Sequence, residues 1–314
     1  MRAFSVYLLA AGLAFAATSC AKKEVAEGDA VPTADAPASP AVKEANVAGQ
    51  FYPGDAAELA AVVKAKLAEA EKTLDAEDVV AIIAPHAGYE YSGGVAATAF
   101  RQVEGRRPAT VVLLGPSHHC GAYEIATGTY GGYKTPLGVA EVDGDFVGAV
   151  AEKCPDVEYT NVPFEKEHGL EVQLPFVQTL FPEARVAPFI FCRHDGAVAG
   201  RFGRALAEVI DDSDGDVLIV TTVDLSHYHP YDEAVRLDRA FLETYERFDA
   251  GAIFRGSGDG EFEIDAPGPV AATFNCAKKL GAAEAVTLEY KNSGDVTGDS
   301  SRGVVGYAAA AVVK

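Results

Sequence analysis

Short apolar stretches rich in β-branched residues alternate with helical patterns along most of the 314-residue chain. The stretches "VVAIIAP" (Val79–Pro85) and "TVVLLG" (Thr110–Gly115) are apolar almost throughout, whereas a strand with one face in water would alternate apolar and polar residues. Continuous apolar strands separated by helices predict an α/β fold with a mostly buried sheet. The further predicted strands are Arg185–Phe191, Asp216–Thr222, Ala285–Tyr290 and Gly303–Val313, and the predicted helices are Ala56–Thr73, Gly94–Val103, Phe146–Lys153, Leu170–Leu180, Val198–Ile210, Tyr231–Tyr245 and Val270–Leu280.

The first twenty residues, "MRAFSVYLLAAGLAFAATSC", do not follow this pattern. Arg2 precedes an apolar stretch from Val6 to Ala17, which is too short to span a bilayer and has the length of a secretory signal's apolar region. Small residues then lead into Cys20, and this arrangement resembles a bacterial lipoprotein signal, in which residues 1–19 are removed and the cysteine is lipidated. An ordinary signal peptide with an incidental cysteine is the alternative. We therefore predict an exported, membrane-anchored lipoprotein of the periplasm or cell surface, attached to the membrane only through its lipid.

The segment from Cys20 to Ala45 is rich in Ala, Pro, Asp and Glu and has no hydrophobic periodicity, so we predict a flexible tether. No further linker-like segment follows, and residues 46–314 are predicted to form one domain. Acidic residues outnumber basic ones 46 to 26, which gives a net charge of −20. Because such a surface repels phosphate backbones, the composition argues against nucleic acid as a partner.

Histidines gather where predicted strands end. Six of the seven histidines lie in four short segments, and three of these segments follow the carboxyl end of a strand. Ligands of open α/β sheets bind at that edge, so the clustering predicts a functional site there. The segments are "PHAGYEYSGG" with His86, "PSHHC" with His118 and His119, "VDLSHYHP" with Asp224, His227 and His229, and "FEKEHGLEVQLPF" with His168.

Each histidine taken alone also has a structural interpretation. A single histidine near a strand end is usually a hydrogen-bonded structural residue. His168 with Glu167 is compatible with a helix start whose free backbone N–H groups they cap, and His229 before Pro230 is compatible with a loop. The convergence of four segments at one edge of the sheet favours a site over a set of unrelated structural residues.

Neutral imidazole is the commonest protein ligand of transition metals. The segment "EFEIDAPGPVAATF" adds a carboxylate, Asp265, just before a predicted helix. Two histidines and one carboxylate with open positions are the pattern of non-heme Fe(II) oxygenases, and a zinc hydrolase uses the same ligand types. Cys120 is a weaker candidate for a nucleophile, because neighbours on an extended chain point to opposite sides. The sequence contains no G-x-S-x-G motif and no phosphate-binding loop of the G-x-x-x-x-G-K-[ST] type.

Six segments resemble a known family when they are read together. "VAGQFYPGDAAEL", "APHAGYEYSGGVAATAF", "LLGPSHH", "EHGLEVQLPF", "VDLSHY" and "NSGDVTGDSSRGVVGYAA" occur in the order and approximate spacing of the Memo-like family, whose bacterial and archaeal members are also called AmmeMemoRadiSam system protein B. The resemblance covers nearly all of residues 46–314. It implies a mixed sheet flanked by helices, similar to class III extradiol ring-cleaving dioxygenases, which are non-heme iron enzymes.

The resemblance also implies a set of metal ligands. The family's ligand positions correspond to His86, His118 and Asp265 of this sequence. At the third position the family usually has a cysteine instead of an aspartate. A carboxylate in place of a thiolate favours Fe(II) or Mn(II) over Cu(I); it is equally compatible with a site that has drifted and binds metal poorly. Asp224, His227 and His119 are expected to line the same cleft.

Three functions follow from these residues. In the leading hypothesis, an Fe(II) protein performs O₂-dependent oxidation of a small organic molecule, while His227 shuttles protons and Asp224 orients its ring. In the second, the same cleft binds a peptide or a small molecule without catalysis. In the third, the chain is a metal-dependent hydrolase.

Overall fold

The computed structural model describes residues 40–119 and 121–314. The predicted signal peptide, Cys20, most of the tether and Cys120 lie outside these residues. The first described element, β1 (Val42–Lys43), pairs in parallel with β5 (Gly132–Thr135), which also pairs with β6 (Gly138–Glu141) in a small separate sheet. The folded unit therefore includes a few residues that the sequence assigned to the tether, and the boundary at Asn46 lies inside it.

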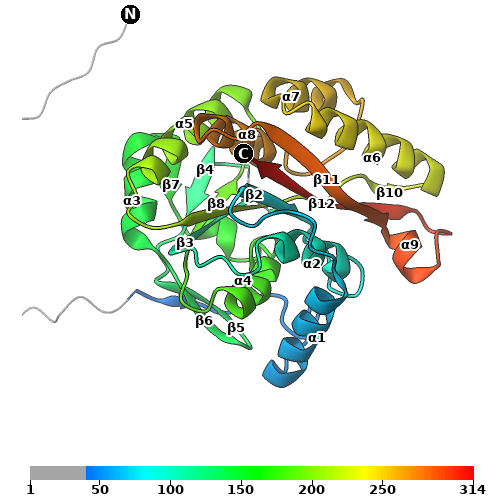
Figure 1. The fold of residues 1–314 in the computed structure, drawn as a ribbon, viewed down its shortest axis with the longest axis horizontal. Coiled ribbons are helices and arrows are strands. Elements are labelled where there is room, and N and C mark those ends of the chain that lie inside the picture. The colour runs from blue at the N-terminus through cyan, green and yellow to red at the C-terminus, as the bar shows by residue number, and fades with distance from the viewer. Residues whose placement is uncertain (1–39, 120) are drawn as a thin grey trace, which may run out of the picture. The chain divides into compact units, whose positions relative to one another are not determined.

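The main sheet is mixed, as expected (Figure 1). Its centre is parallel: β2 (Val79–Ala84), β9 (Val217–Thr222), β3 (Thr110–Pro116) and β8 (Arg185–Phe191) lie side by side in that order. Antiparallel strands flank this centre, because β12 (Val304–Val313) pairs with β2 and β4 (Ile125–Thr127) pairs with β8. The remaining strands are β10 (His227–His229) and β11 (Glu284–Asn292), which both pair with β12, and β7 (Val157–Tyr159), which pairs with β4.

Helices cover both faces of the sheet, which explains why the central strands are apolar throughout. All six residues of β2 are buried, and successive residues point to opposite faces. Ile82 packs into the core on the side of α1 (Ala56–Glu69), α2 (Gly93–Gln102) and α4 (Leu174–Leu180). Ile83 packs on the side of α3 (Gly144–Lys153), α5 (Gly196–Asp211), α6 (Tyr231–Glu246), α7 (Ala250–Asp259) and α8 (Pro267–Lys279). The short helix α9 (Ser293–Thr297) follows β11, and 3-10 turns cover Val162–Phe164 and Glu171–Gln173.

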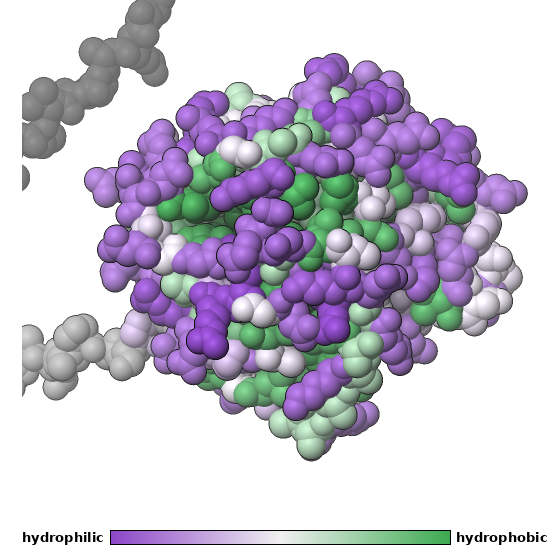
Figure 2. All heavy atoms as spheres, viewed as in Figure 1, coloured by the Kyte–Doolittle hydropathy of each residue, from purple (hydrophilic) through white to green (hydrophobic). Residues whose placement is uncertain are grey.

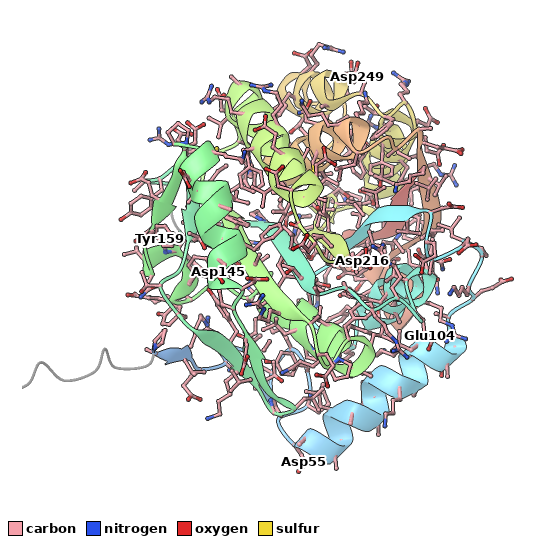
Figure 3. The ribbon with its side chains drawn as sticks, turned by 60° about the vertical axis from the view of Figure 1, so that its left-hand side comes forward. Asp55, Glu104, Asp145, Tyr159, Asp216 and Asp249 are labelled. Carbon is pink, nitrogen blue, oxygen red and sulfur yellow. The ribbon has the colours of Figure 1, made fainter. Side chains whose placement is uncertain are left out.

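The surface is largely hydrophilic on the face shown in Figure 2, in keeping with the net charge of −20. Figure 3 shows acidic side chains at the periphery of the domain, among them Asp55 and Asp249. Each of these two caps a helix, since its carboxylate accepts hydrogen bonds from N–H groups of the first turn of α1 or α7. None of the described helices combines the length and the apolar character that crossing a membrane requires.

Candidate metal centre

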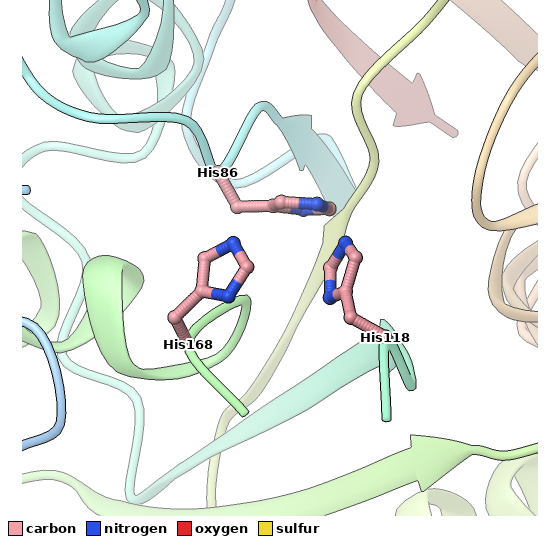
Figure 4. Close-up of side chains that lie close together, drawn as sticks. All are labelled: His86, His118 and His168. Carbon is pink, nitrogen blue, oxygen red and sulfur yellow. The ribbon is translucent and has the colours of Figure 1, made fainter. Parts of the chain in front are cut away.

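His86 and His118 are brought together by the parallel centre of the sheet. His86 lies two residues beyond β2 and His118 two residues beyond β3, at the same carboxyl edge. Their rings meet edge to face, with 5.1 Å between the centroids. His168, just before the 3-10 turn that leads into α4, stacks on His118 with a centroid distance of 4.6 Å. The three imidazoles face one another in Figure 4, and their ligand atoms lie within 4.8 Å of one another, so this group can hold a metal ion.

Asp265 lies next to this group, just before α8. Its Oδ2 atom is 2.8 Å from Nε2 of His86 and 3.5 Å from Nε2 of His118. Metal–ligand bonds of about 2.0–2.2 Å place neighbouring ligands roughly 3 Å apart, so these separations are compatible with one shared ion. The structure thus brings together the three predicted ligands, and it adds His168, which the sequence did not assign as a ligand.

Two buried atoms of the site lack hydrogen bonds. Neither Nε2 of His86 nor Oδ2 of Asp265 has a hydrogen-bond partner among residues 40–119 and 121–314, although the two atoms are in contact. Buried polar atoms are nearly always paired, and an exception calls for an explanation. Two electron-pair donors that face each other without hydrogen-bond geometry fit a shared cation, and the residues present therefore fit a metal ion.

A threonine sets the tautomer of His86. The Thr222 hydroxyl donates its one proton to the carbonyl of Ala84, at 2.9 Å, so it can only accept from Nδ1 of His86, also at 2.9 Å. Gln173 donates to the same hydroxyl and to the carbonyl of Pro85, which fixes the arrangement. Neutral His86 therefore carries its proton on Nδ1 and directs the Nε2 lone pair at Asp265.

Glu167 orients the ring of His118, as Thr222 orients the ring of His86. One carboxylate oxygen lies 2.8 Å from Nδ1 of His118, and the other accepts the backbone N–H of the same residue at 2.7 Å. The first oxygen also accepts the N–H groups of His168 and Gly169. Glu167 is buried, so this carboxylate holds His118 and His168 together and leaves Nε2 of His118 free toward Asp265.

The carboxylates make the centre attractive to a cation. Burial acts to lower the pKa of His86 and of His118, but neighbouring carboxylates outweigh it. Asp224 and Asp265 raise the pKa of His86 to about 8, and the negative charges of Asp265 and Glu167 beside the ring raise the pKa of His118 to about 10. Burial by itself would raise the pKa of both Asp265 and Glu167. The neighbouring imidazoles outweigh burial: they hold the pKa of Asp265 far below its usual range and lower the pKa of Glu167 to about 2. A metal ion that entered this group would displace protons from the two histidines.

His168 differs from the other two imidazoles. Burial and the neighbouring charges of His86 and His118 lower its pKa to about 4, so its ring is neutral near pH 7. The ring of Phe51 packs edge-on against it at 4.8 Å. His168 is therefore available either as a further nitrogen ligand or as a base beside the ion.

Asp224 and His227 do not form the pair that the sequence suggested. Asp224 is buried and accepts the backbone N–H of His86 at 2.8 Å, and its own N–H donates to Asp265 at 3.1 Å. The ring of His227 instead lies 4.0 Å from Glu263, a residue that the sequence did not single out. Asp224 therefore positions His86 and Asp265, while the imidazole of His227 belongs to a neighbouring cluster.

Two other histidines complete the edge of the sheet. His119 is exposed, and its ring is 6.3 Å from that of His118. His194, which the sequence set apart from the clusters, lies close enough to hydrogen-bond the backbone of Asp265, and burial lowers its pKa. It is thus a neighbour of the centre without facing the ligand atoms described above.

The Memo-like protein family model matches residues 43–311. The chain belongs to this family. The MEMO1 family protein MK0963 of Methanopyrus kandleri is 37% identical to it, over 84% of this chain and 96% of that protein. The MEMO1 family protein of Aquifex aeolicus is 36% identical over 85% and 97% of the two chains, and that of Nitrosopumilus maritimus 30% identical over 85% and 98%. The crystal structure of uncharacterized protein JW3007 from Escherichia coli K12 covers 73% of this chain and 98% of its own, with a TM-score of 0.45 and 11% identity.

Sequence reasoning missed two residues that build the centre of this Memo-like protein, Thr222 and Glu167, and it placed His168 in the cluster without assigning it as a ligand. Thr222 is the last residue of a buried strand, and a polar side chain in that place was the available signal. Glu167 precedes His168 in the "EHG" motif, where its acidic side chain was interpreted as part of a helix start. The sequence alone does not show that this carboxylate reaches across to His118.

Proposed function

We propose that this Memo-like protein is a metalloprotein with a mononuclear site formed by His86, His118 and Asp265, and that Fe(II) is the ion it prefers. The main support is the pair of buried donor atoms, Nε2 of His86 and Oδ2 of Asp265, which lie 2.8 Å apart without a hydrogen bond. The tautomers that Thr222 and Glu167 impose direct both imidazole lone pairs to the same point.

The donor set supports the choice of ion. Two imidazoles and one carboxylate form the facial arrangement of non-heme Fe(II) sites, and oxygen donors suit Mn(II) as well. A bound Fe(II) ion would supply O₂ activation and would coordinate a small organic substrate at its open positions. We therefore propose O₂-dependent oxidation of a small organic molecule as the activity.

The chain's own residues would support such a reaction in distinct ways. Asp224 holds the backbone of His86 and the carboxylate of Asp265 in place. His168, neutral near pH 7, can take up a proton on Nε2, the ring nitrogen other than the one 3.7 Å from Glu167. Phe51 covers one edge of that ring and limits access of water to it. His119 is exposed beside His118, where it could contact a substrate that approaches from solution.

Hydrolysis is the second candidate, and the state of His168 favours it. A neutral imidazole beside a bound cation is suited to taking a proton from water as well as from an organic substrate. The two activities differ in their need for O₂, so turnover under anaerobic conditions separates them. Retention of a specific ligand by a site without turnover would instead indicate a binding protein.

The experiment that tests the proposal is metal analysis of protein purified without oxygen. We expect about one equivalent of iron in the wild-type chain, and loss of that iron in His86→Ala and His118→Ala. His119→Ala is the matched control, because it removes an adjacent histidine that does not face the ion, and it should keep the iron. A wild-type chain that binds neither iron nor another transition metal after reconstitution, or a His86→Ala variant that binds as well as wild type, would contradict the proposal.

We also propose that the protein is an exported lipoprotein anchored through Cys20. The proposal is supported by the leader in residues 1–20 and by the tether-like composition that follows it. Metabolic labelling with a fatty acid tests it: wild type should incorporate the label, and Cys20→Ser should not. Labelling of both chains, or of neither, would contradict it.

A further inference from the structure

Two loops beside the metal centre run next to each other and are linked at two points. At the first point, the N–H of Asp224 donates to Asp265 at 3.1 Å, and the N–H of Asp265 donates to the carbonyl of Asp224 at 3.2 Å. At the second, the N–H of His227 donates to Oε1 of Glu263 at 3.1 Å. The first link fixes Asp265, an acidic residue of the centre described above. The second link belongs to a separate cluster of side chains.

This second cluster consists of His227, His229 and Glu263. Nε2 of His229 lies 2.8 Å from Oε2 of Glu263, and Nδ1 of His227 lies 4.0 Å from Oε1 of the same carboxylate. The side chains are 32%, 34% and 45% exposed, in that order, so an ion from solution can reach them. Two imidazoles thus share one carboxylate at the outer edge of the sheet.

The backbone between the two histidines is strained. Tyr228 has φ of +60°, a left-handed conformation that is unfavourable for a large side chain. The pairing of β10 with β12 is irregular at the same place. The conformation is possible because Gly303 lies against it: a Cβ atom on Gly303 would be 2.5 Å from the carbonyl oxygen of Tyr228. Burial does not compensate for the strain, since Tyr228 is 76% exposed.

An ion pair alone is a poor explanation for this arrangement. A half-exposed pair such as the one between His229 and Glu263 contributes little to stability, so it does not account for the strain at Tyr228. Such a pair also needs neither a second imidazole nor a backbone distortion between the two histidines. Backbone strain that persists at an exposed position is more often part of a functional site.

We propose that His227, His229 and Glu263 form a second metal site, which takes a divalent ion of borderline softness such as Zn²⁺. Two imidazoles and a carboxylate leave at least one position for water, as in open zinc sites. In the structure Nδ1 of His227 is still 4.0 Å from Oε1 of Glu263, and these three residues are not among the groups of the described residues that have three ligand atoms within 4.8 Å of one another. The second site therefore closes when the ion arrives, through rotation of the half-exposed side chain of His227 toward Glu263.

Zinc titration of the full chain, in competition with a chromophoric chelator, tests this site. We expect two equivalents of Zn²⁺ in wild type and one equivalent in His229→Ala and in Glu263→Gln. Glu261→Gln is the matched control, because it removes an exposed acid two residues away, and it should keep both equivalents. Unfolding curves of the metal-free variants should lie close to that of wild type, since what each variant loses is the half-exposed contacts of Glu263 with His229 and His227.

The two sites can be judged separately by adding His86→Ala. This variant should lose one equivalent and keep the one that depends on His229. If His229→Ala and Glu263→Gln still bind two equivalents with wild-type affinities, the second site is refuted. If wild type binds one equivalent that survives His86→Ala and disappears in His229→Ala, the second site stands and the mononuclear site of the proposed function fails.

Discussion

The single proton of the Thr222 hydroxyl decides how His86 presents its ring. Because that proton goes to Ala84, the hydroxyl must accept from Nδ1, and the lone pair of His86 is left on Nε2. A residue that contacts no ion thereby controls which nitrogen a metal can use.

Thr222→Val removes this control at nearly constant volume. We expect the affinity of the primary site for metal to fall about 10–100-fold, which is typical when the group that orients a histidine ligand is lost. Thr221→Val is the matched control, because the neighbouring hydroxyl contacts Thr273 and not His86. Competition with a chelator measures both affinities, and equal losses in the two variants would show that the effect is general destabilisation.

The three residues predicted as ligands could be singled out from the sequence one by one, and the structure brings them together. His86, His118 and Asp265 each follow a strand or precede a helix in a way that marks the binding edge of an α/β sheet, and the family resemblance selected them from the other candidates. His168 was not assigned, because its neighbour Glu167 fits a helix cap equally well in sequence. The difference depends on where the Glu167 side chain points, which only the packing of His118 against His168 settles.

At the level of elements, the central strands were the most predictable part. β2, β3, β8 and β9 are buried on both faces, so their apolar composition predicts where each strand begins and ends to within a residue or two. The short strand β4, with three residues, has no such signature, because its conformation follows from pairing with β8 and β7. The helix predicted from Leu170 begins as a 3-10 turn, and this turn carries Gln173 to the Thr222 hydroxyl.

The strained conformation of Tyr228 in β10 requires a glycine at position 303. Gly303→Ala places a Cβ against the backbone of Tyr228 at a residue with φ of +84°, and we expect it to lower the free energy of unfolding by roughly 2–4 kcal/mol. Gly298→Ala is the control: its φ is +74°, but a Cβ there meets nothing within 4 Å, so the loss should be about 1 kcal/mol. Urea unfolding measures both, and equal losses would contradict the close contact between Gly303 and Tyr228.

For the whole molecule, the metal centre links stability to pH. The pKa values of His86 and His118 are raised to about 8 and about 10, so the folded metal-free protein holds protons that the unfolded chain, with histidine pKa values near 6.5, has released. The stability from these histidines is complete below pH 6.5 and is lost as the pH rises through 8 and then 10. A bound ion replaces the protons and removes this dependence.

We therefore expect the free energy of unfolding of the metal-free protein to fall between pH 6.5 and 10 more steeply than that of the metal-loaded protein. Denaturant titrations at a series of pH values measure the two slopes. The loaded form serves as the control for the general effect of a net charge of −20, which both forms share. Parallel curves would show that the two histidines do not carry the raised pKa values.

The donors of the primary centre come from segments as distant as His86 and Asp265, and the completed fold brings them together through the sheet and the linked loops of Asp224 and Asp265. Zinc fingers, by contrast, have ligands close in sequence, and their metal organises an otherwise unfolded chain. Here the order of events is reversed: the polypeptide must complete its architecture before any ion finds more than one ligand at a time. The ion that we propose would therefore be taken up in the compartment where folding ends, from the metals that this compartment offers.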